Sequence, residues 1–415
     1  MKKRLELCKK NSFVLTVLSV CSVFVVLFMS AGPAHSAQTA VVATVATDWS
    51  SGAHSTISVD PVGGPRTAQN ELFPTGSDIT VSAYGNYFYR FERSGANNAT
   101  KFDINAPDTV IWQFSTEGVD TNSNPYGLVF VSSDKAYLLR YGSTKAWIVN
   151  PSATTEAGFK IGELDLGSYA DADGFPEMAG GVIVGNKLFI ILQRLESWAS
   201  TVTPYIAVFD ITTDTEIDTG IPNPDGVLGI PLDIRDPLAI QYLAENNTIY
   251  VQGIGSYFPV EYTGGIVSID PDTYATAMVL DDGTDANHPY GQISGMAIVS
   301  AAKGYFVGYD GWGDNTLYSF DPATGVVGSS VAGLENKSIA GMESGVYPDD
   351  NDMLWICNQT DARVDILNIT DDSIDESVST SLNPLKVVFC DETAGTGSGD
   401  GGSSNCFIST SACGL

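Results

Sequence analysis

Short apolar runs rich in β-branched and aromatic residues alternate with polar turns along this chain, and seven of the runs stop at an Asp or Asn. These seven residues are Asp60, Asp103, Asn150, Asp210, Asp270, Asp321 and Asn368, and they follow one another at intervals of 43 to 60 residues. Asp and Asn side chains accept hydrogen bonds from the backbone of a turn that they begin. The pattern therefore predicts β-strands that end in tight turns and recur with the roughly 40–50-residue period of a propeller blade.

Each repeat also contains an earlier tight turn, as at 85–86, 185–186 and 246–247. These turns are rich in Gly and Asn, which tolerate the positive φ angles that hairpins require. The predicted order is strand A, tight turn, strand B, loop, strand C ending in Asp or Asn, turn, and strand D. Six complete units are predicted at 79–116, 125–167, 175–220, 236–283, 292–333 and 338–379.

The first repeat, at about 40–75, lacks its own strand A. A matching strand lies at the other end of the chain, because 383–389 resembles the strand A at 124–130. A C-terminal strand that completes the N-terminal blade would close the ring and remove its free edges. The chain is therefore predicted to be an all-β protein, a seven-bladed β-propeller over residues 38–390.

Residues 1–37 differ from the rest of the chain. Basic residues precede an apolar run at 13–29, and small residues follow it up to Ala37. This is the arrangement of a signal peptide. The apolar run is also nearly long enough to span a bilayer of about 30 Å, so an uncleaved anchor is the alternative. The protein is expected to be exported, to the periplasm, the outer membrane surface or the extracellular space.

The C-terminal end changes composition after Cys390. Residues 391–405 are rich in Gly, Ser and Thr, which predicts a flexible linker. Residues 406–415 resemble the Cys-Phe-Ile tag of exported bacterial proteins, through Cys406, Phe407, Ile408 and Thr410. The resemblance implies a sorting or anchoring signal with Cys406 as the modified residue. The alternatives are a disordered tail or a disulfide with Cys413.

The body of the chain resembles the YncE-like, YVTN-repeat β-propellers of bacterial cell envelopes. The resemblance rests on degenerate repeats over about 40–390, and the nearest forms of the motif are Thr248-Ile249-Tyr250-Val251 and Trp355-Ile356-Cys357-Asn358. The literal Tyr-Val-Thr-Asn sequence is missing. Members of this family are mostly binding or scaffolding proteins, so the resemblance implies binding rather than catalysis.

The chain is strongly acidic, with 20 Lys and Arg against 49 Asp and Glu and a net charge of −29. Nucleic acids and anionic lipids are disfavoured as partners, because both need cationic side chains. The acidity fits cationic ligands or, more simply, a well-solvated surface.

The sequence offers little for catalysis. Beyond residue 37 the only histidines are His54 and His288, and no nucleophile elbow or zinc-helix motif is present. A triad assembled from distant residues remains open. The alternative to a binding protein is a propeller-type lyase or hydrolase that uses Glu177, His288 or an Asp-rich loop as a base or metal site.

The Asp-rich loop carries Asp171, Asp173 and Glu177 around Gly174. Alternating carboxylates before a Gly allow oxygens to converge on a hard cation, so calcium is the predicted ion. The spacing is a poor match to an EF-hand. In the alternative interpretation, the acids cap backbone amides of their own loop.

In a propeller the D-to-A and B-to-C loops share one face. These loops carry the predicted ligand-binding residues Trp49, Tyr141, Arg194, Trp198, Tyr257, Tyr290, Tyr309 and Trp312. Aromatic rings beside acids and amides suit a glycan, another small molecule or a protein partner. For any single ring, the favoured alternative is packing over the end of a blade. Arg194 is expected to pair with Asp171 and Asp173, or to hold an anionic ligand.

Overall fold

The computed structural model describes residues 38–61, 63–119, 121–196, 198–340 and 345–391. The predicted signal peptide, all but the first residue of the linker, and the tag with Cys406 lie outside these residues. Within the described ranges, no helix is both long and apolar enough to cross a membrane.

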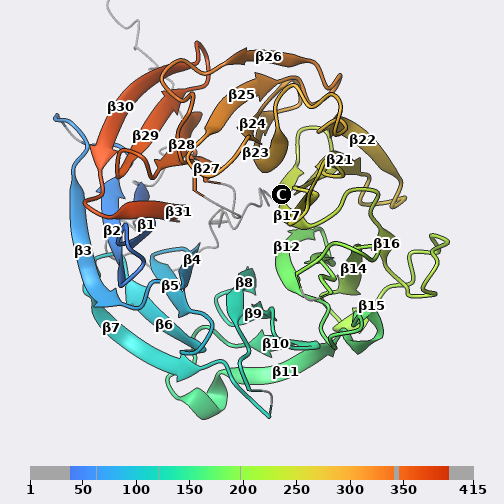
Figure 1. The fold of residues 1–415 in the computed structure, drawn as a ribbon. Helices are drawn as coiled ribbons and strands as arrows, with labels where there is room; N and C mark the ends of the chain where they lie inside the picture. Colours follow the sequence, from blue (N-terminus) through green and yellow to red (C-terminus); the bar gives the residue numbers. More distant parts are fainter. Residues whose placement is uncertain (1–37, 62, 120, 197, 341–344, 392–415) are drawn as a thin grey trace, which may run out of the picture. The chain divides into compact units, whose positions relative to one another are not determined.

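Seven antiparallel sheets follow one another around a central axis and form a seven-bladed β-propeller (Figure 1). From the axis outwards, blade one contains β31 (Asn383–Asp391), β1 (Gln38–Val45), β2 (Gly52–Ser58) and β3 (Ala68–Thr75). Blade two contains β4 (Ile79–Tyr84), β5 (Tyr87–Glu92), β6 (Asn98–Asp103) and β7 (Ala106–Ser115). Blade three contains β8 (Pro125–Ser132), β9 (Lys135–Arg140), β10 (Lys145–Val149) and β11 (Lys160–Asp165). Blade four contains β12 (Met178–Val184), β13 (Lys187–Leu192), β14 (Tyr205–Asp210) and β15 (Thr215–Glu216), and β16 (Ile230–Pro231) also pairs with β14.

Blades five to seven continue the ring. Blade five contains β17 (Pro237–Leu243), β18 (Thr248–Gly253), β21 (Gly265–Ile269) and β22 (Thr276–Asp281). Blade six contains β23 (Gln292–Ser300), β24 (Lys303–Tyr309), β25 (Asn315–Phe320) and β26 (Val327–Ser330). Blade seven contains β27 (Val346–Pro348), β28 (Met353–Asn358), β29 (Arg363–Asn368) and β30 (Ser373–Ser379). A hairpin of β19 (Ser256–Tyr257) and β20 (Val260–Glu261) extends from blade five. Two short 3-10 helices, η1 (Glu156–Gly158) and η2 (Gly167–Tyr169), flank β11.

The predicted ring closure is confirmed. Strand β31 pairs antiparallel with β1 from Gln38↔Asp391 to Val45↔Asn383, and Val41 lies opposite Val388. The N-terminal and C-terminal strands therefore share one sheet, and the ring has no open edge at the junction.

The strand-ending Asp and Asn residues form the turns that the sequence predicted. In six of the seven, the side-chain oxygen accepts a hydrogen bond from the backbone N–H two residues later: Asp103, Asn150, Asp210, Asp270, Asp321 and Asn368. The seventh, Asp60, accepts a hydrogen bond from the Asn351 side chain of blade seven at 3.0 Å. The repeat therefore has a local cause, because in these six blades strand C ends in a residue that accepts a hydrogen bond from an amide of its own turn.

The core lies between neighbouring blades, and strand β13 illustrates the arrangement. Leu188, Ile190 and Leu192 pack with residues of blade three. Phe189 and Ile191 point to the other side of the sheet and pack with residues of blade five. Because successive side chains of a strand point to opposite faces, a strand covered on both faces needs a continuous apolar run.

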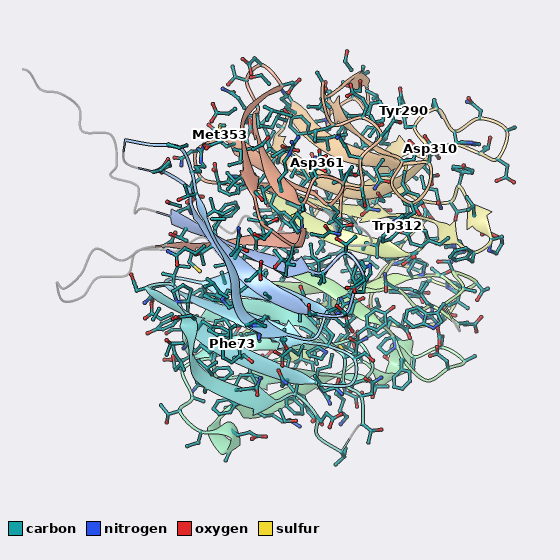
Figure 2. All side chains as sticks on the ribbon, turned by 60° about the vertical axis from the view of Figure 1, so that its left-hand side comes forward. Phe73, Tyr290, Asp310, Trp312, Met353 and Asp361 are labelled. Carbon is teal, nitrogen blue, oxygen red and sulfur yellow. The ribbon has the colours of Figure 1, made fainter. Side chains whose placement is uncertain are left out.

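The two faces of the ring differ in their connections. The A-to-B and C-to-D turns form one face, called here the turn face, and the B-to-C and D-to-A loops form the other, called the loop face. In Figure 2, Met353 beside a turn lies on the opposite side of the ring from Asp310 and Trp312. The candidate residues of the sequence therefore lie on or beside the loop face, and their role in binding stays a prediction.

Candidate functional site

A cavity of about 700 Å³ opens on the loop face over blades four, five and six. It is formed by the B-to-C loops at 193–204, 254–264 and 310–314, together with strand ends beneath them. Four of the predicted ligand-binding residues line it: Trp198, Tyr257, Tyr309 and Trp312. Tyr262 and Phe258 add two further rings. The volume lies within the roughly 300–1,000 Å³ of small-molecule sites.

The two cavity tryptophans are held by short closed loops. Trp198 has a φ of 71° and lies between Glu196 and Ala199, which form an isolated β-bridge. Trp312 stands between two glycines, and the backbone amide of Asp314 donates to the carbonyl of Gly311. The tryptophans remain 74% and 71% exposed. Large rings held in the open by ordered loops are expected at a binding surface.

Beneath the rings lie buried polar groups. Asp236 is buried, has a φ of 47°, and its Oδ1 accepts a hydrogen bond from Gln193 Nε2 at 2.7 Å. Burial raises the pKa of the Asp236 carboxyl to about 7. Gln292 also lines the cavity, and its Nε2 donates to the carbonyls of Ile254 and Ser256, which holds the 254–264 loop in place.

Asn315 is the second buried polar group that lines the cavity. It is only 3% exposed, and its Nδ2 donates to the carbonyl of Ile339 at 3.2 Å. Its Oδ1 has no hydrogen-bond partner among the described residues. A buried amide oxygen without a donor costs free energy. Asn315 is therefore a buried polar group at the cavity wall whose acceptor oxygen no described residue satisfies.

The described residues that line the cavity include Asp236 and Asp310 but no Lys, Arg or His. Two arginines near the rim are engaged elsewhere. Arg194 pairs with Asp225 at 2.7 Å and donates to the Thr203 carbonyl, and Arg235 donates to the Val202 carbonyl. The cavity thus favours an uncharged or cationic ligand and disfavours an anionic one.

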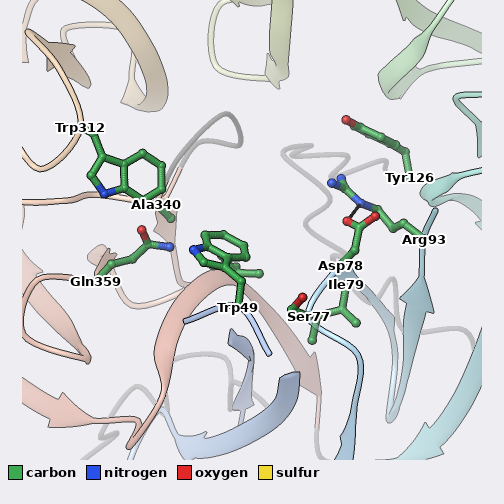
Figure 3. A pocket seen from close by; sticks show the side chains of 10 residues that line it. Trp49, Ser77, Asp78, Ile79, Arg93, Tyr126, Trp312, Ala340 and Gln359 are labelled. Atoms are coloured by element: carbon green, nitrogen blue, oxygen red, sulfur yellow. Dashed lines mark hydrogen bonds and ion pairs between the residues drawn. The ribbon is translucent and has the colours of Figure 1, made fainter. Parts of the chain in front are cut away.

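A smaller pocket of about 220 Å³ lies beside the cavity, towards blades seven, one and two (Figure 3). Trp49 and Trp312 line it on one side. On the other side, Arg93 pairs with Asp78 at 2.7 Å, and its guanidinium lies 4.5 Å from the ring centre of Tyr126.

Of the four predicted ligand-binding residues outside the cavity lining, Trp49 lines the smaller pocket and the other three line neither hollow. Tyr141 is buried, with its ring stacked between Tyr126 and Trp198 at centroid distances of 4.6 and 6.4 Å. Tyr290 packs edge-on against Phe306 and Tyr318 of blade six.

Arg194 is the third of these residues. Its ion pair is with Asp225, from the loop that follows blade four, and not with Asp171 or Asp173 as its sequence position suggested. Asp225 lies 31 residues further along the chain, so local spacing gave no sign of this pair.

Asp171 and Asp173 cap the backbone of their own loop, and Glu177 caps the backbone of the loop that follows β13. Asp171 Oδ1 accepts from the amide of Asp173, Asp173 Oδ1 from that of Phe175, and Glu177 Oε2 from that of Leu195. Burial, with the charges of Asp173 and Asp171, raises the pKa of Glu177 to about 8. Within the described ranges, no three His, Cys, Asp or Glu side chains form a group that could hold a metal ion. Calcium binding at Asp171, Asp173 and Glu177 stays a prediction.

Among the residues that line the cavity, sequence reasoning missed the polar and aromatic residues Asp236, Tyr262 and Gln292, besides several small and apolar ones. Asp236 directly precedes a strand A, Gln292 begins the next one, and Asn315 begins a strand C. Strand ends of this kind occur in every blade, so nothing in the local sequence separates these residues from their counterparts. The one sequence feature that pointed to this part of the cavity was the Gly-rich loop before Asn315, because it also carries Trp312.

Comparison with known proteins gives the fold. No family model matches the chain, and no curated protein matches it. Among solved structures, a protein from Lactobacillus plantarum aligns with a TM-score of 0.59 and 11% identity over 85% of this chain and 99% of its own. The periplasmic gluconolactonase PpgL of Pseudomonas aeruginosa aligns with a TM-score of 0.58 and 13% identity over 86% and 99%.

A Bacteroides uniformis protein, proposed to be a 6-phosphogluconolactonase, aligns with a TM-score of 0.58 and 13% identity over 85% of this chain and 99% of its own. At these identities the likeness establishes a shared propeller fold. It does not extend to the residues of the cavity.

Proposed function

We propose that this protein is an exported binding protein for uncharged carbohydrate, and that the cavity over blades four to six is its binding site. The observation that carries the proposal is the combination of exposed rings with buried acceptor oxygens in one cavity. Trp198 and Trp312 offer flat apolar faces, and Asn315 Oδ1 at the cavity wall has no hydrogen-bond partner among the described residues. A sugar ring has an apolar C–H face that can stack on the tryptophans, and it has hydroxyl groups that can donate hydrogen bonds to polar groups of the cavity.

Charge supports the same choice. A phosphorylated or carboxylated sugar would meet Asp236 and Asp310, with no cation from the described lining to balance it. A cationic ligand would neutralise these acids, but it would leave most of the apolar ring faces of Phe258 and Trp312 exposed to solvent. The leader-like residues 1–37 support export.

The test is a screen of the purified protein against immobilised neutral, sialylated and sulfated glycans. Retention on neutral glycans alone is expected. Trp198→Ala and Asn315→Leu should each weaken binding about tenfold, which corresponds to about 1.4 kcal/mol. Phe175→Ala is the matched control, because Phe175 is an exposed ring on the same face outside the cavity.

Two outcomes would contradict the proposal. The first is a lack of retention on any neutral glycan. The second is tighter binding of choline or tetramethylammonium than of every neutral glycan, which would assign the rings to a cation.

A hydrolase is the second candidate, and Asp236 is the observation that favours it. Its carboxyl lines the cavity with a pKa raised to about 7 by burial, which suits a general base near neutral pH. An uncharged sugar lactone fits the same charge argument. In its hydrolysis Asp236 would take a proton from water as the water oxygen bonds to the carbonyl carbon. It would then return the proton to the ring oxygen as the ring C–O bond breaks, which releases the open-chain hydroxy acid and restores the Asp236 carboxylate.

The assay for this candidate uses glucono-1,5-lactone. A hydrolase should open it faster than buffer alone, and Asp236→Asn should remove the excess rate while binding persists. Equal rates with the native protein and with buffer would leave binding as the function.

A further inference from the structure

The cavity and the smaller pocket meet at one side chain. Trp312 lines both of them, and its ring centroid lies 6.5 Å from that of Trp49 with an interplanar angle of 54°. Figure 3 shows both rings beside the smaller pocket. Trp312 therefore stands at the boundary between two adjoining hollows of the loop face.

Trp49 is presented in the same manner as Trp312. Its loop closes through a hydrogen bond from the Ala46 amide to the Ser51 carbonyl, and the Trp49 amide donates to the carbonyl of Ala46. Trp49 has a φ of 57°, an unusual value for a large side chain, and it is 45% exposed. The chain thus holds two exposed tryptophans side by side at the smaller pocket, Trp49 with a strained backbone and Trp312 between two glycines.

The smaller pocket repeats the chemistry of the cavity. Its Arg93 is paired with Asp78 and lies over Tyr126, so the pair presents polar atoms without net charge. Gln359 is buried there, and its Nε2 donates to the carbonyl of Pro384. Aromatic faces, amide groups and balanced charge suit another uncharged, hydroxylated ring.

We propose that the cavity and the smaller pocket are two subsites of one groove, and that the ligand is a linear uncharged oligosaccharide with at least one sugar unit in each. Trp312 stacks at the junction, and Trp49 contacts only the units beyond it. The inference rests on the proposed carbohydrate function. It adds the length of the ligand and the direction in which it lies across the ring.

Two subsites make affinity depend on chain length. A monosaccharide gains contacts in the cavity alone, while a longer chain adds the smaller pocket without a second loss of translational freedom. The removal of Trp49 should therefore affect long oligosaccharides and leave short ones unchanged. A single site would show neither behaviour.

The experiment is calorimetric titration of the purified protein with malto-, cello- and chito-oligosaccharides, each from the monosaccharide to the hexamer. In the series that binds, affinity should rise about tenfold or more with length and then level off. Trp49→Ala should remove this rise and retain the affinity for the monosaccharide. Trp312→Ala should weaken binding at every length, and Phe175→Ala should change nothing.

Three results would overturn the inference. Affinity that is already complete with the monosaccharide confines the ligand to the cavity, and the proposed function then survives alone. An equal loss at all lengths in Trp49→Ala makes Trp49 part of a single site. If no member of the three series binds, the carbohydrate function falls together with the groove. Thermal unfolding of each variant verifies that it is folded.

Discussion

The turn face and the loop face of this ring are built from the same strands but differ in regularity. On the turn face, strand ends repeat the same Asx turn from blade to blade, and lysines reach across to the next blade. On the loop face, connections range from 380–382 to the hairpin-bearing 254–264, and the exposed tryptophans gather there. The repeated part of a blade thus builds the frame, while departures from the repeat form the candidate binding site.

The bonds between blades on the turn face show how regular the frame is. Lys303 and Tyr305 of blade six both bind Asp372 in the C-to-D turn of blade seven, at 2.8 and 2.5 Å. Lys135 and Tyr137 of blade three bind Asp214 of blade four in the same way, at 2.8 and 2.5 Å. Each pair fixes the angle between two neighbouring blades.

The strongest way to break the frame is a charge in the closing strand. Val388 of β31 is fully buried, so Val388→Asp places an unpaired carboxylate in the core and should cost about 4 kcal/mol or more of unfolding free energy. Val326→Asp is the matched control, because Val326 is 65% exposed and its replacement should cost less than about 0.5 kcal/mol. Urea unfolding measures both. Equal midpoints for the two variants would mean that β31 does not hold the ring closed.

The next largest effect is a pH dependence from the loop face. Burial raises the pKa of Asp236 to about 7, so the folded protein holds a proton that the unfolded chain releases near pH 4. The native protein therefore loses stability as the pH rises from about 4 to about 7. Asp236→Asn lacks this titration, and its stability relative to the native protein should improve by roughly 1–4 kcal/mol between pH 4 and pH 8, at about 1.4 kcal/mol per pKa unit.

Urea unfolding of Asp236→Asn and the native protein at the two pH values gives this difference. Asp285→Asn, at an exposed position of the same face, is the control, and its difference from the native protein should stay constant. If Asp236→Asn also differs from the native protein by the same amount at both pH values, Asp236 is not the buried acid that the cavity geometry requires.

A smaller effect sharpens the role of the turn face. Tyr305→Phe removes the hydroxyl that donates to Asp372, and should cost about 1–2 kcal/mol, because Asp372 is partly exposed and regains water. Tyr242→Phe loses an exposed hydrogen bond to Asn247 and should cost no more than about 0.5 kcal/mol. Glycan binding should remain native in both variants. A loss of binding in Tyr305→Phe at native stability would contradict the division between the two faces.

The blades and their closing strand could be predicted from the sequence, because strands and turns depend on residues that are close together in the chain. A strand that ends at Asp210 or Asn368 carries its own turn signal, and the apolar run of β13 marks burial on both sides. Even the closing strand could be recognised, because 383–389 repeats the pattern of 124–130.

The candidate site could be predicted only in part, because the residues that form it come from different blades. Trp198 and Trp312 stood out as large apolar residues in polar loops, and the structure brings them to one cavity. The burial of Asp236 and the pairing of Arg194 with Asp225 depend on how loops from successive blades pack together. No local pattern of residues encodes that packing.

We expect the exposed tryptophans of the loop face to serve ligand binding and not folding. The most direct test measures urea unfolding and neutral-glycan binding on the double variant Trp198→Ala, Trp312→Ala. Unfolding free energy within about 0.5 kcal/mol of the native protein, with binding lost, is the predicted result, because both rings are mostly exposed. A loss of several kcal/mol, or binding that survives the removal of both rings, would contradict the account.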